Sequence, residues 1–218
     1  MDRLERLEHP VEALKVAMEG NQSTIWTTLP GIINSFDATN MTVTVRPAIQ
    51  AYYTDKVTRE STWINLPLLL DVPIVIQSAG GISFTLPIAI VDECLVSFSS
   101  RCIDSWWTLG GIQNQADFRM HDLSDGFAFL GPKSLPHIIS NYSTTTAQIR
   151  NADKSLLIDL NPTSHAISIT ASSIVINGAL TVNGNIESTG TLKNNSVNVG
   201  STHKHISASP GSLTGVPQ

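Results

Sequence analysis

The chain has 218 residues, of which 41% are hydrophobic, so it can form one or two domains with a core and is not globally disordered. Only 14% of the residues are charged and the formal net charge is −5, which excludes a broad basic surface for nucleic acid. So few charges favour a chain that covers much of its surface in an oligomer.

Cys94 and Cys102 are the only cysteines, and they form no C-x-x-C motif. Two thiols cannot build a disulfide framework, so we expect free, buried thiols in a protein made in the cytoplasm. The first residues lack the apolar core of a signal peptide, and no stretch approaches about 18 apolar residues. We therefore expect neither a leader sequence nor a membrane-spanning helix.

Residues 1–25 are predicted to be an N-terminal helical segment. Its apolar residues are spaced as in a short heptad stripe, and Pro10 either interrupts the stripe or sets the first turn of a helix. Such a helix either clasps neighbouring subunits or lies on its own domain. The stripe consists of Leu4, Leu7, Val11, Leu14 and Met18.

Residues 26–132 are predicted to form one compact β domain. Met41, Val43 and Val45 alternate with polar residues and should face inward, and Gly80-Gly81 should close a hairpin. Five or six short strands in about a hundred residues are typical of a small closed barrel of the OB type. The expected strands and apolar runs are 31–36, 41–46, 64–70, 72–77, 82–86 and 93–98, with Asp71 separating the third from the fourth and with Cys94, Val96 and Phe98 on one face of the last.

The chemistry of this barrel is expected to be structural. OB barrels often bind nucleic acid, but basic residues are few, and the paired Trp106 and Trp107 belong to a predicted short helix. His121, Asp122 and Asp125 resemble an acid–base set, yet no nucleophile or oxyanion donor accompanies them. We expect Asp122, Ser124 and Asp125 to hydrogen-bond backbone groups in a tight turn, and we interpret the domain as a collar without a catalytic site.

Residues 133–143 are predicted to be a linker and 144–202 a shaft. The shaft segment contains no Phe, Trp or Tyr, and its short aliphatic runs alternate with turn signals such as Asn177-Gly178. Free strands of this kind would leave unpaired edges, so we expect three copies to wind into an intertwined β-helix. The alternative is a partly disordered Ser/Thr/Asn tail. The expected runs are 155–160, 166–170, 173–176, 179–182 and 193–200.

His203 and His205 are the candidate metal ligands of an apex formed by residues 203–218. Residues i and i+2 of an extended strand point to the same side, so three chains on one axis would supply six imidazole nitrogens. Six nitrogens suit an octahedral ion, and we expect one iron ion per trimer or another octahedral transition metal.

Three stretches carry a resemblance to a known family. The opening 29–33, the segment 99–106 and above all Asp122-Leu-Ser-Asp125 are similar to the N-terminal domain of central spike proteins of contractile phage tails. This family includes the spike of phage Mu. The apex Thr202-His-Lys-His205, with the Gly- and Pro-containing tail after it, also resembles the family's tip, although Ile206 follows where the family often has Gly.

The resemblance implies an all-β homotrimer with an OB-fold collar, a β-helix shaft and an iron-capped tip. It implies a structural, non-enzymatic spike that sheath contraction drives through the host outer membrane. The expected location is the baseplate tip of the virion, and the expected partners are baseplate hub proteins, with no nucleic acid. The alternative is a tail fibre or receptor-binding adhesion protein.

Overall fold

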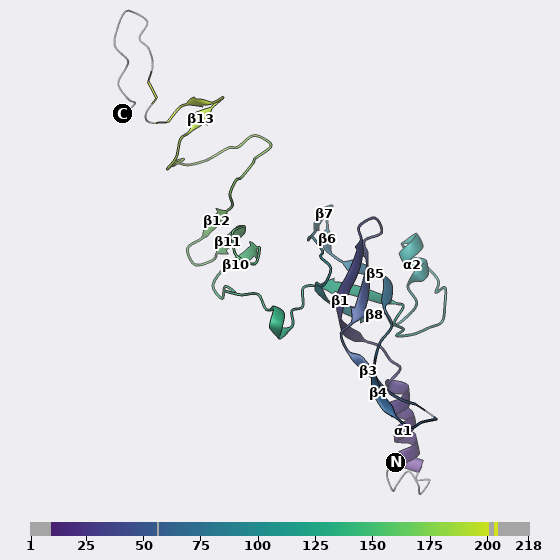
Figure 1. Cartoon of the computed structure of the whole chain (residues 1–218). Helices are drawn as coiled ribbons and strands as arrows, with labels where there is room; N and C mark the ends of the chain where they lie inside the picture. Colours follow the sequence, from purple (N-terminus) through teal and green to yellow (C-terminus); the bar gives the residue numbers. More distant parts are fainter. Residues whose placement is uncertain (1–9, 56, 201–202, 205–218) are drawn as a thin grey trace, which may run out of the picture. The chain divides into compact units, whose positions relative to one another are not determined.

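The computed structural model describes residues 10–55, 57–200 and 203–204, which divide between two compact units, 1–142 and 143–218 (Figure 1). None of the described helices is long and apolar enough to cross a membrane. The elements of the first unit are α1 (Pro10–Gln22), β1 (Thr28–Asp37), β2 (Thr42–Pro47), β3 (Gln50–Thr54), β4 (Ser61–Asn65), β5 (Leu69–Val75), β6 (Gln77–Ala79), β7 (Ile82–Phe84), β8 (Glu93–Phe98), α2 (Asp104–Leu109), β9 (Gly126–Leu130) and a 3-10 turn, Leu135–His137.

Five strands of the first unit close into a barrel in the order β1-β2-β5-β9-β8. All neighbouring pairs are antiparallel except β5 and β9, which are parallel. Counted as barrel strands alone, the order is 1-2-3-5-4, the Greek-key arrangement of an OB-type barrel. The predicted closed β-barrel is therefore confirmed.

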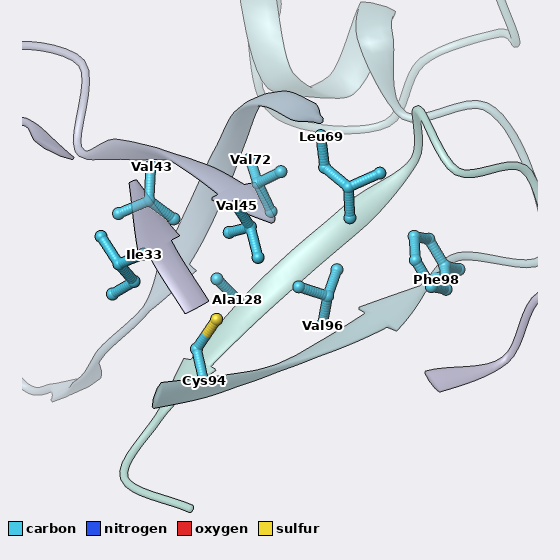
Figure 2. Close-up of a cluster of buried hydrophobic side chains, with 9 residues drawn as sticks. All are labelled: Ile33, Val43, Val45, Leu69, Val72, Cys94, Val96, Phe98 and Ala128. Atoms are coloured by element: carbon cyan, nitrogen blue, oxygen red, sulfur yellow. The ribbon is translucent and has the colours of Figure 1, made fainter. Parts of the chain in front are cut away.

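Nine buried side chains fill the barrel, and Figure 2 shows them gathered between its strands. Cys94, Val96 and Phe98 occupy alternate positions of β8 and are all buried, as the alternation of that strand predicted. The remaining members are Ile33, Val43, Val45, Leu69, Val72 and Ala128.

Met41 was predicted to face inward and does not. Its side chain is 49% exposed, and its φ of 54° places it in the turn before β2 rather than in the strand. Thr42, the first residue of β2, is buried instead. Asp71 was expected to separate two apolar runs, but it lies inside β5 with a φ of 51°.

Two hairpins extend from the barrel connections. Gly80 and Gly81 join β6 to β7 with φ values of 59° and 79°, the left-handed pair that a two-residue turn requires, so this predicted hairpin is confirmed. The second hairpin, β3–β4, buries none of its residues and pairs Tyr52 with Trp63, whose ring centroids are 5.0 Å apart.

Helix α1 begins at Pro10, as one interpretation of that proline predicted. It buries none of its residues, and its apolar stripe is open: Val11, Leu14 and Met18 are 67%, 62% and 64% exposed. Leu4 and Leu7, the first two members of the stripe, lie outside the described residues.

The second unit has two small sheets and a long stretch without strands. β10 (Ala147–Arg150), β11 (Leu157–Asn161) and β12 (Ala166–Thr170) form an antiparallel meander, and β13 (Lys193–Asn194) pairs with β14 (Val197–Asn198). The single strand predicted over 193–200 is thus a hairpin. The strands predicted at 173–176 and 179–182 are absent from the single chain. A ladder needs a neighbouring strand, and no described segment of this chain supplies one there.

Candidate functional site

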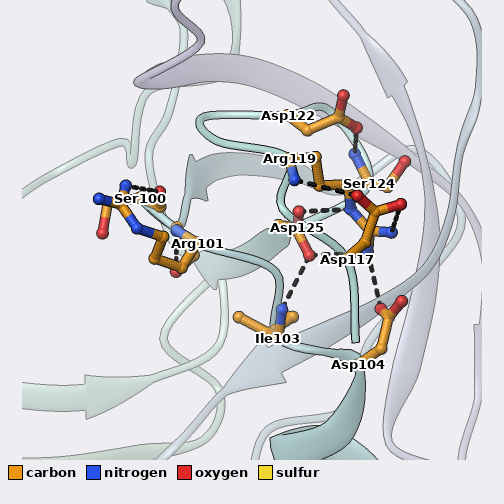
Figure 3. A network of polar contacts seen from close by, with 10 residues as sticks. Ser100, Arg101, Ile103, Asp104, Asp117, Arg119, Asp122, Ser124 and Asp125 are labelled. Carbon is orange, nitrogen blue, oxygen red and sulfur yellow. Dashed lines mark hydrogen bonds and ion pairs between the residues drawn. The ribbon is translucent and has the colours of Figure 1, made fainter. Parts of the chain in front are cut away.

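Asp125 is the centre of a polar clamp in the barrel unit. Its side chain is 0% exposed and receives hydrogen bonds from the Ile103 backbone N–H at 2.9 Å and from Arg119 at 2.7 and 2.9 Å (Figure 3). Arg119 also donates to Asp104 at 2.8 Å. These bonds tie the loop before α2 to the turn before β9, so the long connection from β8 to β9 is held closed.

The clamp is an ion pair between Arg119 and Asp125 whose side-chain atoms are already engaged in hydrogen bonds. The hydrogen bonds from Arg119 to Asp125 raise the pKa of the guanidinium further above its usual value. Both carboxylate oxygens of Asp125 are already acceptors, and a paired, hydrogen-bonded buried charge is the form that a protein interior tolerates. An acid–base role for Asp125 would require breaking these bonds.

Asp122 forms the turn that the sequence predicted. Its carboxylate accepts the Ser124 backbone N–H at 2.8 Å, and this bond lowers the pKa of the carboxyl group. His121 contacts the Trp26 carbonyl oxygen through Nδ1 at 3.2 Å and has a φ of 50°. Asp125 departs from the prediction, because its main partner is the side chain of Arg119 rather than the turn itself. Nothing in the sequence spacing marked Arg119 as that partner.

Cys102, Asp104 and Asp125 form a group with possible metal-ligand atoms within 4.8 Å of one another. The positive charge at this position is already provided by Arg119, which bridges Asp104 and Asp125. The group is therefore a structural ion-pair network.

Glu93, Ser134 and His137 form a second polar group where the chain leaves the barrel. Glu93 accepts hydrogen bonds from the Ser134 hydroxyl, from the Ser134 backbone N–H at 2.7 Å and from His137 Nδ1 at 2.9 Å. These bonds, those from the Ser134 side chain most of all, lower the pKa of Glu93 to about 2. Ser134 and Glu93 both approach the same nitrogen of His137, whereas a Ser–His–acid relay uses both ring nitrogens. The group fastens the start of the linker to β8.

An apolar groove of about 590 Å³ lies on the barrel beside the β6–β7 hairpin. It is lined mainly by aliphatic and aromatic side chains, and none of its lining residues is ionisable. Met41, Phe84 and Leu86 are about half exposed along it. The groove offers contact area and no catalytic group.

Of the two predicted metal ligands, His203 is described and His205 lies outside the described residues. His203 Nδ1 is 2.7 Å from the Gly200 carbonyl oxygen, and the Gly200 N–H donates in turn to Asn198 Oδ1 at 2.9 Å. A carbonyl oxygen can only accept, so Nδ1 is the donor in this contact. Metal-binding histidines commonly have this arrangement, so His203 fits the role of a ligand.

The comparisons with known proteins concern the barrel. Residues 29–131 match the family model described as the phage protein Gp138 N-terminal domain. The match indicates a phage structural protein related to tails or baseplates, and hence a virion component. It ends where β9 ends and does not extend into the second unit. No curated protein matches the chain.

Proposed function

We propose that this protein is the membrane-piercing spike of a contractile phage tail, acting as a homotrimer. The observation that carries the proposal is the pairing of a phage Gp138-type barrel with a second unit in which no described residue is buried. In this reading the barrel is the collar that attaches to baseplate hub proteins. The second unit is the shaft that enters the host outer membrane when the sheath contracts.

The exposed aliphatic side chains of the second unit support a trimer. None of its described residues, 143–200 and 203–204, is buried, although aliphatic side chains recur along it. Folded proteins bury such residues because exposing them to water is unfavourable, and in the proposed trimer the other two chains would cover them. Examples beyond the meander are Ile174, Val175, Ile176, Leu180, Val182 and Ile186, which are 44% to 75% exposed.

The proposed tip metal supports the same arrangement. His203 has the donor geometry of a ligand, and three chains with His203 and His205 would hold one iron ion or another octahedral metal. Such an ion would be structural, because six protein ligands leave no position open for a substrate. The proposed role is mechanical and non-enzymatic, and the partners are hub proteins and the outer membrane rather than nucleic acid.

The location of the chain on the phage particle tests the proposal against a tail fibre or adhesion protein. Gold-labelled antibody against residues 1–142 should mark a single point at the distal end of the extended tail. Labels at several peripheral positions would contradict a central spike and support a fibre.

The metal is tested on the purified full chain. Elemental analysis should find one transition-metal ion per three chains, and His203→Ala and His205→Ala should each abolish it without changing the trimer mass. His165→Ala is the matched control, because this histidine lies far along the chain from the tip. A wild-type protein without stoichiometric metal would contradict the proposed tip.

A further inference from the structure

The meander of the second unit has one face that is wholly apolar. Directly paired residues of an antiparallel sheet point to the same side, so the register sorts the side chains into two faces. One face consists of the rows Ile149, Ile158, Ile169 and Ala147, Leu160, Ile167. The opposite face carries Gln148, Asp159, Ser168 and Arg150, Leu157, Thr170.

This apolar face is open in the single chain. Ile158 and Leu160, on the central strand β11, are 36% and 42% exposed, and Ile167 on β12 is 70% exposed. Together the face offers on the order of 400 Å² of aliphatic surface, comparable to the largest apolar patch of a typical whole monomer. No described residue of the same unit covers it, since none of the patch is buried.

On the polar face, Asp159 is hydrogen-bonded within its own chain. Asp159 accepts hydrogen bonds from Thr146 and from Gln148 at 2.6 Å, all within the same chain. These bonds lower the pKa of Asp159, so its carboxylate is stable as a charge facing water. Residues 148, 150, 157 and 159 of the polar face are half-buried within their own chain, whereas the apolar face is left open.

We infer that the apolar face packs against the same face of two other copies around a threefold axis. The inference rests on the proposed trimer and specifies how its shaft begins. The face carries no ionisable group, so identical copies meet there without like-charge repulsion, and each supplies the aliphatic surface that the others need. On the opposite face, Arg150 or Asp159 would repel its own copy at such an axis.

With this packing, the base of the shaft is held together by side chains rather than by strand pairing between chains. β11 is hydrogen-bonded on both sides within its own chain, so the three strands of 147–170 pair with one another before any copy joins them. The shaft then starts as a prism of three self-paired sheets that associate by side-chain packing. Interchain strand pairing of the intertwined kind is left to the stretch after residue 170, where the single chain has no ladder until residue 193.

Paired cysteine substitutions in the full chain test this packing. Ile158 and Leu157 are neighbours on β11, both aliphatic, and point to opposite faces. With a short thiol-specific cross-linker, Ile158→Cys should give covalent dimers, limited to two of every three chains because three thiols surround one axis. Leu157→Cys should give at least tenfold less. The wild type sets the background, and it should be low because burial raises the pKa of the Cys94 thiol to about 11.

A second pair of variants gives an independent measurement on the same positions. Ile158→Lys should convert the trimer to smaller species in light scattering, whereas Leu157→Lys should keep the trimer mass. A trimeric wild type in which Leu157→Cys cross-links as well as Ile158→Cys would overturn the inference and leave the proposed spike standing. A trimer that tolerates Ile158→Lys would do the same and leave the face for another partner. A monomeric wild type would overturn both.

Discussion

Replacing Arg119 by Met tests whether the Asp125 clamp holds the barrel connection closed. The variant keeps the apolar stem of the side chain and removes its two hydrogen bonds to Asp125, at 2.7 and 2.9 Å. Asp125 is 0% exposed, so its charge stays buried with only the Ile103 N–H as a donor.

The size of the expected stability loss follows from the burial of Asp125. Removing one partner of a buried ion pair costs about 3–5 kcal/mol, because the remaining charge is left without compensation. The Arg119 side chain is 23% exposed, so water screens part of the interaction and we expect a loss of about 3 kcal/mol. Asp117→Asn is the matched control: this carboxylate is 61% exposed and 3.9 Å from Arg119, and its loss should cost under about 0.5 kcal/mol.

The assay is urea unfolding followed by tryptophan fluorescence. All four tryptophans precede residue 143, so the signal reports on the barrel unit alone. Trp106 lies 5.7 Å from Phe127 between ring centroids, close to the clamp. Arg119→Met with a loss no larger than that of Asp117→Asn would refute the reasoning. In Arg119→Met/Asp125→Leu, where no charge is left buried, much of the stability should return.

Three further predictions concern other parts of the chain. Gly31→Ala should destabilise the barrel by about 1–3 kcal/mol in the same assay, because a Cβ there would lie 2.3 Å from Val45 Cγ1, while Gly20→Ala should cost nothing. Hydrogen bonds from Ser134 hold the pKa of Glu93 at about 2, against an ordinary value of 4.5. The stabilising contribution of the Glu93 carboxylate is therefore present above pH 4.5 and disappears as the pH falls to 2. Stability measured during acid titration should not show this loss in Glu93→Gln. A chain ending near Pro132 should lose the detergent resistance of the trimer on unheated gels while keeping a folded barrel, and equal resistance would place that stability outside the second unit.

The barrel was predictable from sequence because its local signals agree with its packing. Alternation placed Cys94, Val96 and Phe98 on one face of β8, and the Gly80-Gly81 pair fixed a turn. Predictions failed where a single residue left the strand geometry. Met41 continues the alternation in sequence, but its positive φ removes it from the strand.

The clamp was not predictable because its partners are distant along the chain. Ile103 and Asp125 are separated by 22 positions, and Arg119 contacts Asp104 across 15. Hydrophobic periodicity carries no information about such pairs. The acidic stretch could be recognised as a turn from Asp122 and Ser124, but the burial of Asp125 follows from the closed barrel beneath it.

In the second unit, the alternation of apolar residues along the sequence does not by itself decide which segments form strands. In 166–170 the sequence alternation and the single chain agree, because β11 is present to pair with β12. In 173–182 the same kind of alternation produces no strand, and the aliphatic side chains stay in water. Alternation gives a strand only when a neighbour exists, and in the proposed trimer the neighbour of this stretch would belong to another chain. In that trimer, residue 170 would mark the passage from the meander, which one chain pairs by itself, to the stretch 173–182, which would gain its ladder on assembly.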